Sequence, residues 1–119
     1  MSFAFEDLKV YQKALDFTVS VIDAIDELET PRKHYRLIEQ LEAASSSVAL
    51  NLAEGKGRYS KKEYKHFCYI ARGSLYETIS VLQIFKKKRW LTEKTYSKLY
   101  ENAVEINKMI SGLIYSIQA

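Results

Sequence analysis

The sequence predicts an all-α protein that folds as an antiparallel four-helix bundle, with its helices in up-down-up-down order. Four glycines and one proline among 119 residues leave few places for the chain to turn, and these places fall at regular intervals. Apolar residues recur in alternating steps of three and four, the spacing of one buried helix face. Because short connections make sequential helices antiparallel, and 119 residues suit one domain, we expect a single bundle over residues 1–119.

The first two helices are separated by a turn with a clear start signal. Thr30 is typical of an N-cap, and Pro31 would occupy the first helical position, where its missing N–H costs nothing. Gly55 and Gly57 follow the second helix and suit a left-handed C-terminal cap. Apolar spacing continues through Ala43–Ser47, so we expect close helix approach there. A serine-rich loop is the alternative.

The third and fourth helices also have start signals. Ser60 and Glu63 form a capping box, with Tyr59 and Tyr64 placed for the accompanying hydrophobic staple. Thr92 is the N-cap candidate of the last helix, whose apolar seam follows the bundle spacing. The four helices are expected near residues 6–29, 31–54, 61–89 and 93–117.

Apolar residues cover more of the first helix than a bundle requires. They form two neighbouring stripes that together span roughly 220° of the helix surface, where an arc of about 100° suffices. The third helix has a similar surplus. This surplus favours a homo-oligomer over a monomer, and deeper burial within one bundle is the alternative. The stripes of the first helix are Tyr11, Leu15, Val19, Ile22 and Ile25, and Val10, Ala14, Phe17, Val21, Ala24 and Leu28. The third helix has Tyr64, Phe67, Ala71, Leu75, Ile79 and Leu82 on one side and Ile70, Val81 and Ile84 on another.

Charge is distributed unevenly along the chain. The whole sequence has a formal net charge of +3, but the segment from Lys56 to Arg89 contains ten basic and two acidic residues. That segment therefore carries +8, which leaves −5 for the remainder. Such a block indicates either an anion-facing surface or a solvated basic helix.

One face of the third helix alternates cations with tyrosines over roughly 37 Å, comparable to one turn of duplex. Lysine and arginine neutralise phosphates, and tyrosine stacks on unpaired bases. Two alternatives remain: the terminal lysines complement the helix dipole, or the tyrosines pack on a neighbouring subunit. Gln83 belongs to the same face. The candidate nucleic-acid-binding residues are Arg58, Lys62, Lys65, Tyr69, Arg72, Tyr76, Lys87, Lys88 and Arg89.

Other classes of site lack support in the sequence. The one cysteine, Cys68, and two histidines cannot form a disulfide or a four-ligand zinc site, and Cys68 is expected to be a small core residue. Glu63 and His66 have di-iron spacing, but a second such pair is missing, so His66 is expected at the surface or in packing. We expect no cofactor, metal or catalysis. Without a secretion signal or an apolar run long enough for a membrane, a cytoplasmic protein is expected.

Three segments resemble one protein family. Phe5–Ala14, Asn51–Arg58 and Gly73–Glu77 are similar, in this order, to signatures of the bacterial four-helix-bundle family encoded in intervening sequences of 23S ribosomal RNA genes. That family includes proteins similar to the accessory variability determinants of diversity-generating retroelements. The resemblance implies a homopentameric ring with RNA or DNA as the partner. A protein-interaction module that recruits a reverse transcriptase or another nucleic-acid enzyme is the alternative function.

The family motifs also have structural interpretations. Gly55 and Gly57 are expected to turn the chain, and Gly73 to let another helix approach. Glu77 shares a face with apolar residues, where a carboxylate needs a cation, and Arg58 or a neighbouring subunit is the candidate source. The motif positions are Ala53, Glu54, Gly55, Gly57 and Arg58, and Gly73, Ser74, Leu75 and Glu77.

Overall fold

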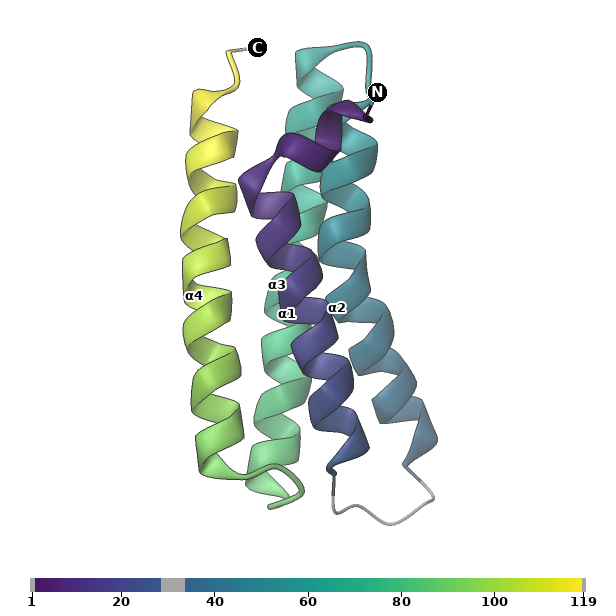
Figure 1. Ribbon diagram of the computed structural model, residues 1–119, viewed down its shortest axis with the longest axis vertical. Coiled ribbons are helices and arrows are strands. Elements are labelled where there is room, and N and C mark those ends of the chain that lie inside the picture. Colours follow the sequence, from purple (N-terminus) through teal and green to yellow (C-terminus); the bar gives the residue numbers. More distant parts are fainter. Residues whose placement is uncertain (1, 29–33, 119) are drawn as a thin grey trace.

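The structure is a computed structural model that describes residues 2–28 and 34–118. Its four α-helices run along an elongated molecule of 46 × 24 × 22 Å (Figure 1). No strand occurs in the described ranges, so the predicted all-α bundle is confirmed. The elements are the 3-10 turn η1 (Ala4–Asp7) and the helices α1 (Lys9–Asp26), α2 (Tyr35–Lys56), α3 (Lys61–Lys87) and α4 (Glu93–Ser116).

The helices pack as a square with alternating directions. α1 contacts α2 and α4, and α3 contacts the same two helices from the opposite corner. The α2–α3 connection lies beside the first and last described residues, at the end drawn uppermost in Figure 1, and the α3–α4 connection lies at the other end. We call these the upper and lower ends. The predicted up-down-up-down order is therefore confirmed.

The starts of the first two helices differ from the sequence prediction. The first helix does not begin at residue 6, because the chain forms η1 and then an extended residue, Leu8, before α1 starts at Lys9. Phe5 packs edge-on against Tyr11 with ring centroids 5.0 Å apart, which holds the turn against α1. α2 starts at Tyr35, and the predicted Thr30–Pro31 cap lies outside the described residues.

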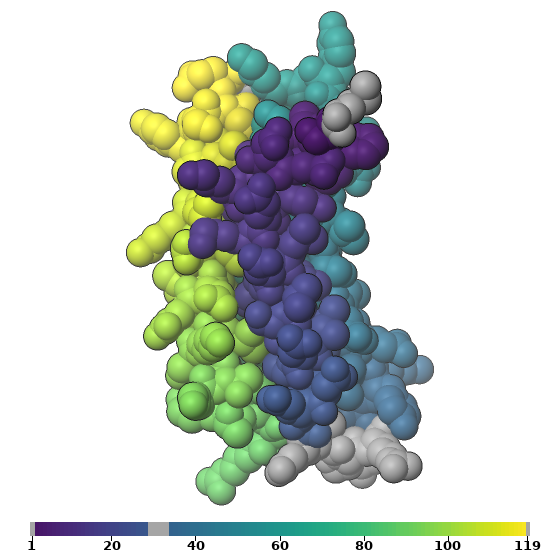
Figure 2. All heavy atoms as spheres, viewed as in Figure 1, coloured from purple at the N-terminus to yellow at the C-terminus, as the bar shows by residue number. Residues whose placement is uncertain are grey.

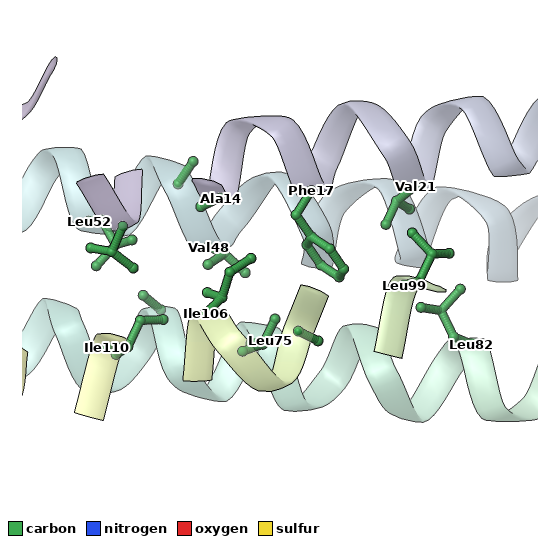
Figure 3. Close-up of a cluster of buried hydrophobic side chains, with 14 of the residues drawn as sticks. Ala14, Phe17, Val21, Val48, Leu52, Leu75, Leu82, Leu99, Ile106 and Ile110 are labelled. Carbon is green, nitrogen blue, oxygen red and sulfur yellow. The ribbon is translucent and has the colours of Figure 1, made fainter. Parts of the chain in front are cut away.

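The core consists of the inward seams of all four helices. Phe17 from α1 extends between side chains of the other helices (Figure 3) and is 1% exposed. The predicted seams of α2 and α4 lie in or against this core. Cys68 is also fully buried, as predicted. Labelled core residues in Figure 3 include Ala14, Val21, Val48, Leu52, Leu75, Leu82, Leu99, Ile106 and Ile110.

The small residues of α2 allow close helix approach, as predicted. The helix continues unbroken through Ser45 and Ser47, so the alternative of a serine-rich loop is wrong. The Ser47 and Ser74 hydroxyls lie 2.9 Å apart and share a hydrogen bond between α2 and α3. On the other side, Thr18 of α1 donates its hydroxyl to the Ser45 carbonyl at 2.9 Å. Hydrogen bonds therefore tie α2 to both neighbours.

The middle of the α1 stripe that runs from Tyr11 to Ile25 is left uncovered by the described residues. Leu15, Val19 and Ile22 are 42%, 57% and 39% exposed, so the alternative of deeper burial is wrong for these residues. Figure 2 shows the α1 surface running between α4 and α2 along the molecule. On α3, the surplus is smaller than predicted, because Val81 is buried and only Ile70 and Ile84 are exposed. Most of the surplus apolar surface therefore belongs to α1.

Candidate nucleic-acid interface

α3 carries most of the predicted interface, and its first turn is fixed by a side-chain cap. The Glu63 N–H donates to Ser60 Oγ at 3.1 Å, which confirms the predicted N-cap. Tyr59 is fully exposed and does not pack on Tyr64, so the predicted hydrophobic staple is wrong. The cap leaves Tyr59 in solvent beside the lysines that open α3.

The left-handed helix cap lies at Arg89, not at the predicted glycines. Arg89 has a φ of 62°, and the Trp90 N–H donates to the Phe85 carbonyl at 3.0 Å. These are the features of a Schellman cap, here built on an arginine. Gly55 lies inside α2, and Gly57 has a φ of −85°, so the prediction of a left-handed turn there is wrong. α2 continues past its expected end to Lys56, and Gly55 packs against α3.

Five cations form what we call the upper basic cluster: Lys56, Arg58, Lys61, Lys62 and Lys65. Arg58 pairs with Glu54 at 2.5 Å, and its guanidinium lies 4.5 Å from the Phe67 ring. Lys56 lies 5.5 Å from the Tyr64 ring. Lys61 and Lys62 are exposed, and Lys65 is half-buried. The lysines that open α3 are therefore available to an external anion, while Arg58 is held by the protein.

Four cations form the lower basic cluster at the other end of α3: Lys86, Lys87, Lys88 and Arg89. Lys86 pairs with Glu93 at 3.2 Å and lies 4.5 Å from the Tyr96 ring. Lys88 lies 5.8 Å from the Trp90 ring. Lys87, Lys88 and Arg89 are exposed, so this cluster too presents cations to solvent.

Arg72 is the only cation between the two clusters on α3. Its guanidinium donates to the Ser111 hydroxyl of α4 at 3.1 Å and lies 5.0 Å from the Tyr69 ring. Tyr69 and Tyr76 are 48% and 53% exposed. The cation and tyrosine face found in the sequence is thus basic at its ends and aromatic in its middle.

The aromatic middle borders a groove of about 330 Å³ between α3 and α4. Tyr100, Val104 and Asn107 supply its α4 side and were missed in the sequence. They follow one another in steps of four and three beside the buried seam, and this spacing is the signal that could have found them. The groove is lined by Leu75, Tyr76, Ile79, Ser80, Gln83, Tyr100, Ala103, Val104 and Asn107.

Several family-motif residues lie on the opposite flank of α3, toward α2, although Leu75 lines the groove on the α4 side. A Cβ on Gly55 would lie 2.7 Å from Phe67 Cβ, so this glycine permits close contact with α3. A Cβ on Gly73 would meet nothing within 4 Å, so the predicted approach of another helix to Gly73 is not made by the described helices of the same chain. Glu77 accepts a hydrogen bond from Gln40 Nε2 at 3.3 Å. Arg58 of the same chain pairs with Glu54, so this candidate partner of Glu77 is wrong, and a cation from a neighbouring subunit stays a prediction.

Burial controls the two titratable groups in the interior of α3. Burial raises the pKa of Cys68 to about 11 and, with a smaller contribution from Cys68, raises the pKa of Tyr64 to about 12. His66 is exposed, edge-on to Phe67, as expected. Within the described ranges, no group of three acidic, cysteine or histidine side chains is placed to hold a metal ion, and no helix is long and apolar enough to cross a membrane.

The sequence matches the family described as the 23S rRNA-intervening sequence protein over residues 6–112. This match includes all three signature segments except Phe5, and all but the edges of the bundle. The chain belongs to this family. Membership confirms the resemblance drawn from the three segments.

A known crystal structure has the same fold as this chain. It is a crystal structure of a protein of unknown function from the S23 ribosomal protein family of Bacteroides thetaiotaomicron. The TM-score is 0.81 at 23% sequence identity, over 88% of this chain and 97% of the other. No curated protein matches the sequence significantly. The structural similarity supports the bundle and carries no information on binding.

Proposed function

We propose that this 23S rRNA-intervening sequence protein is a non-catalytic, oligomeric scaffold in the cytoplasm that binds RNA or DNA. The observation that carries the proposal is the arrangement of α3, with exposed cations at both ends and exposed tyrosines between them. Only Arg58 and Lys86 of the two basic clusters form ion pairs among the described residues. Lysines that face solvent can exchange their counterions for phosphates, which releases those ions and favours binding at low salt.

The uncovered stripe of α1 supports the oligomeric part of the proposal. Leu15, Val19 and Ile22 form an apolar row that a second copy of the chain could bury. A ring of five copies, which family resemblance suggests, would repeat the basic clusters five times and carry a summed charge of +15 from the +3 of each chain. Several weak contacts on one nucleic acid would then act together as avidity.

A salt series on two charge-reversal variants tests the proposal. Binding of a fluorescent 20-nucleotide RNA should weaken steeply as salt rises. The triple variant Lys62→Glu, Lys65→Glu, Lys87→Glu should bind at least about tenfold more weakly at low salt, and its dependence on salt should be shallower. The matched control, Lys9→Glu, Lys94→Glu, Lys98→Glu, makes the same charge change at exposed positions on α1 and α4. Equal losses in both variants would mean that net charge, and not the α3 surface, governs binding.

The α1 stripe also favours a second function, recruitment of another protein such as a nucleic-acid enzyme. Val19→Lys would place a charge in the middle of the stripe, where any apolar partner would have to bury it. If Val19→Lys leaves the oligomer mass unchanged in light scattering and the wild type binds no RNA or DNA at low salt, the scaffold proposal is wrong and a protein partner is the better account of the exposed stripe.

A further inference from the structure

The groove between α3 and α4 has the shape and lining of a site for one flat ligand. Tyr76 and Tyr100 border it, at 53% and 43% exposure, and Leu75 and Ala103 are buried beneath. Its volume of about 330 Å³ lies at the lower end of the range for small-molecule sites. Aromatic edges above an apolar floor suit a ring that stacks, because a planar ligand can cover both at once.

Amide groups of Asn107 and Gln83 line the groove beside the tyrosines. Asn107 Oδ1 is buried and accepts no hydrogen bond, which leaves an acceptor without a donor. Because Oδ1 is buried, the Asn107 amide has to turn before this oxygen can meet a ligand in the groove. Gln83, at the same groove, donates to the Tyr96 hydroxyl at 3.2 Å. A base, which carries donors and acceptors on one edge, would satisfy Asn107 where an apolar helix could not.

Cations flank the groove along the axis of α3. Lys65 and Lys87 each lie roughly 16 Å from Tyr76 along the helix axis, in opposite directions. Arg72 lies between Lys65 and Tyr76, about 6 Å from Tyr76 along the axis. Their total span of about 33 Å corresponds to roughly ten stacked nucleotides of one strand. Phosphates could therefore contact both basic clusters while a base between them occupies the groove.

We propose that the α3–α4 groove binds an unpaired base of single-stranded nucleic acid whose phosphates contact the two basic clusters. This inference rests on the proposed function and specifies the form of nucleic acid. Bases in a duplex are paired and stacked inside the helix, so they can enter a groove only after they are flipped out. Bases of a single strand stack on aromatic side chains without that cost.

Fluorescence anisotropy with three 20-nucleotide probes at one low salt concentration tests the inference. The probes are a single strand, the same strand in a blunt duplex, and a strand with abasic sites in its middle. The wild-type protein should bind the single strand at least about fivefold more tightly than the other two probes. The double variant Tyr76→Leu, Tyr100→Leu should lose this preference while its duplex affinity changes less than about twofold.

Three further variants separate the groove from general effects on the fold. Tyr35→Leu removes an equally exposed tyrosine from α2 and should keep the preference. The Phe variants of Tyr76 and Tyr100 retain the rings and should also keep it. Val104→Glu places a carboxylate at an exposed groove position, where it adds no strain to the core, and should abolish the preference.

The outcomes distinguish the groove from the wider proposal. If neither single strand nor duplex binds, both proposals are wrong. If single strand, duplex and abasic strand bind equally, or if the double variant and Val104→Glu keep the preference, the groove inference is overturned and the scaffold proposal stands. A double variant that changes oligomer mass but keeps the preference would show that the groove is a contact between copies, which also overturns the inference.

Discussion

The two flanks of α3 are built differently. Toward α2, small residues and hydrogen bonds close the contact: Gly55 packs on Phe67, and the Ser47 and Ser74 hydroxyls lie 2.9 Å apart. Toward α4, tyrosines leave a groove of about 330 Å³, and Arg72 reaches across to Ser111 at one point. One flank is filled by atoms of the same chain, while the other has space for atoms from outside.

This difference distinguishes three residues of the family signature from the tyrosines of the groove. Gly55, Ser74 and Glu77 lie on the α2 flank, where they set the spacing of two helices or hydrogen-bond across them. Tyr76 and Tyr100 border the α4 flank, and Tyr100 lies outside the family motifs recognised in the sequence. Gly55, Ser74 and Glu77 therefore have structural roles, and the groove tyrosines are identified by their exposure.

The closed flank should tolerate no added atom at Gly55. A Cβ there would meet Phe67 Cβ at 2.7 Å and the Tyr64 carbonyl at 3.3 Å, so Gly55→Ala forces the helices apart. We expect a loss of about 2 to 3 kcal/mol in the free energy of unfolding, measured with urea. Gly57→Ala is the control, since its Cβ has ordinary contacts and its φ is negative. Equal stability of the two variants would mean that the flank is not closed at Gly55.

The core beneath the open flank should be sealed from solvent, which a pH series can test. The pKa of Cys68 rises to about 11, above its ordinary value of 9.0. Between these values the unfolded thiol loses its proton while the folded thiol keeps it, so stability falls as pH rises. This contribution amounts to about 2 kcal/mol by pH 11. The Cys68→Ala variant should lack this pH-dependent loss of stability. If the unfolding free energies of the wild type and the variant change in parallel from pH 8 to 11, the Cys68 thiol is not sealed from solvent.

The hydrogen bond across the closed flank should have a smaller effect. Ser74→Ala removes the partner of the Ser47 hydroxyl on α3 and leaves its partner Asn51 on α2, whereas Ser80→Ala removes only a bond to the Tyr76 carbonyl of the same helix. Both changes gain similar helix propensity, so their difference isolates the contact between helices. We expect Ser74→Ala to be less stable than Ser80→Ala by about 1 kcal/mol in urea unfolding. Equal stability of the two variants would mean that this hydrogen bond does not stabilise the closed flank.

The outer face of α3 should show the smallest effect, and one of opposite sign. Gly73→Ala adds a Cβ that meets nothing within 4 Å, as does Gly112→Ala on α4. Each should stabilise its helix by up to about 1 kcal/mol, measured by thermal unfolding. If Gly73→Ala instead lowers stability or oligomer mass while Gly112→Ala does not, another copy packs against α3 at Gly73.

Periodicity and capping predicted the helices, their order and most of the core. The apolar seams of α2 and α4 could be predicted because the steps of three and four residues that define a seam lie within a single helix. Ser60 and Thr92 were identified because a cap needs only local sequence, and Thr92 Oγ1 accepts the Thr95 N–H at 3.1 Å.

Features that depend on a second helix could not be predicted in the same way. Gly55 was assigned to a turn because glycine favours one, yet its position is set by Phe67, a residue of the next helix. Arg89 was not expected in a left-handed conformation, since arginine has no preference for it and the cap depends on Trp90 returning to Phe85. The groove could not be predicted either, because it forms only where Tyr100 of α4 lies near Tyr76 of α3.

Photo-crosslinking tests the contrast between the flanks most directly. A single strand of 20 nucleotides with bromouracil throughout would be irradiated with the wild-type protein, and the modified peptides mapped by mass spectrometry. Crosslinks should fall on Tyr69, Tyr76 and Tyr100, on the α4 flank, and high salt should abolish them. Crosslinks concentrated on the α2 flank, around Gln40, Ser47 and Asn51, would contradict the account.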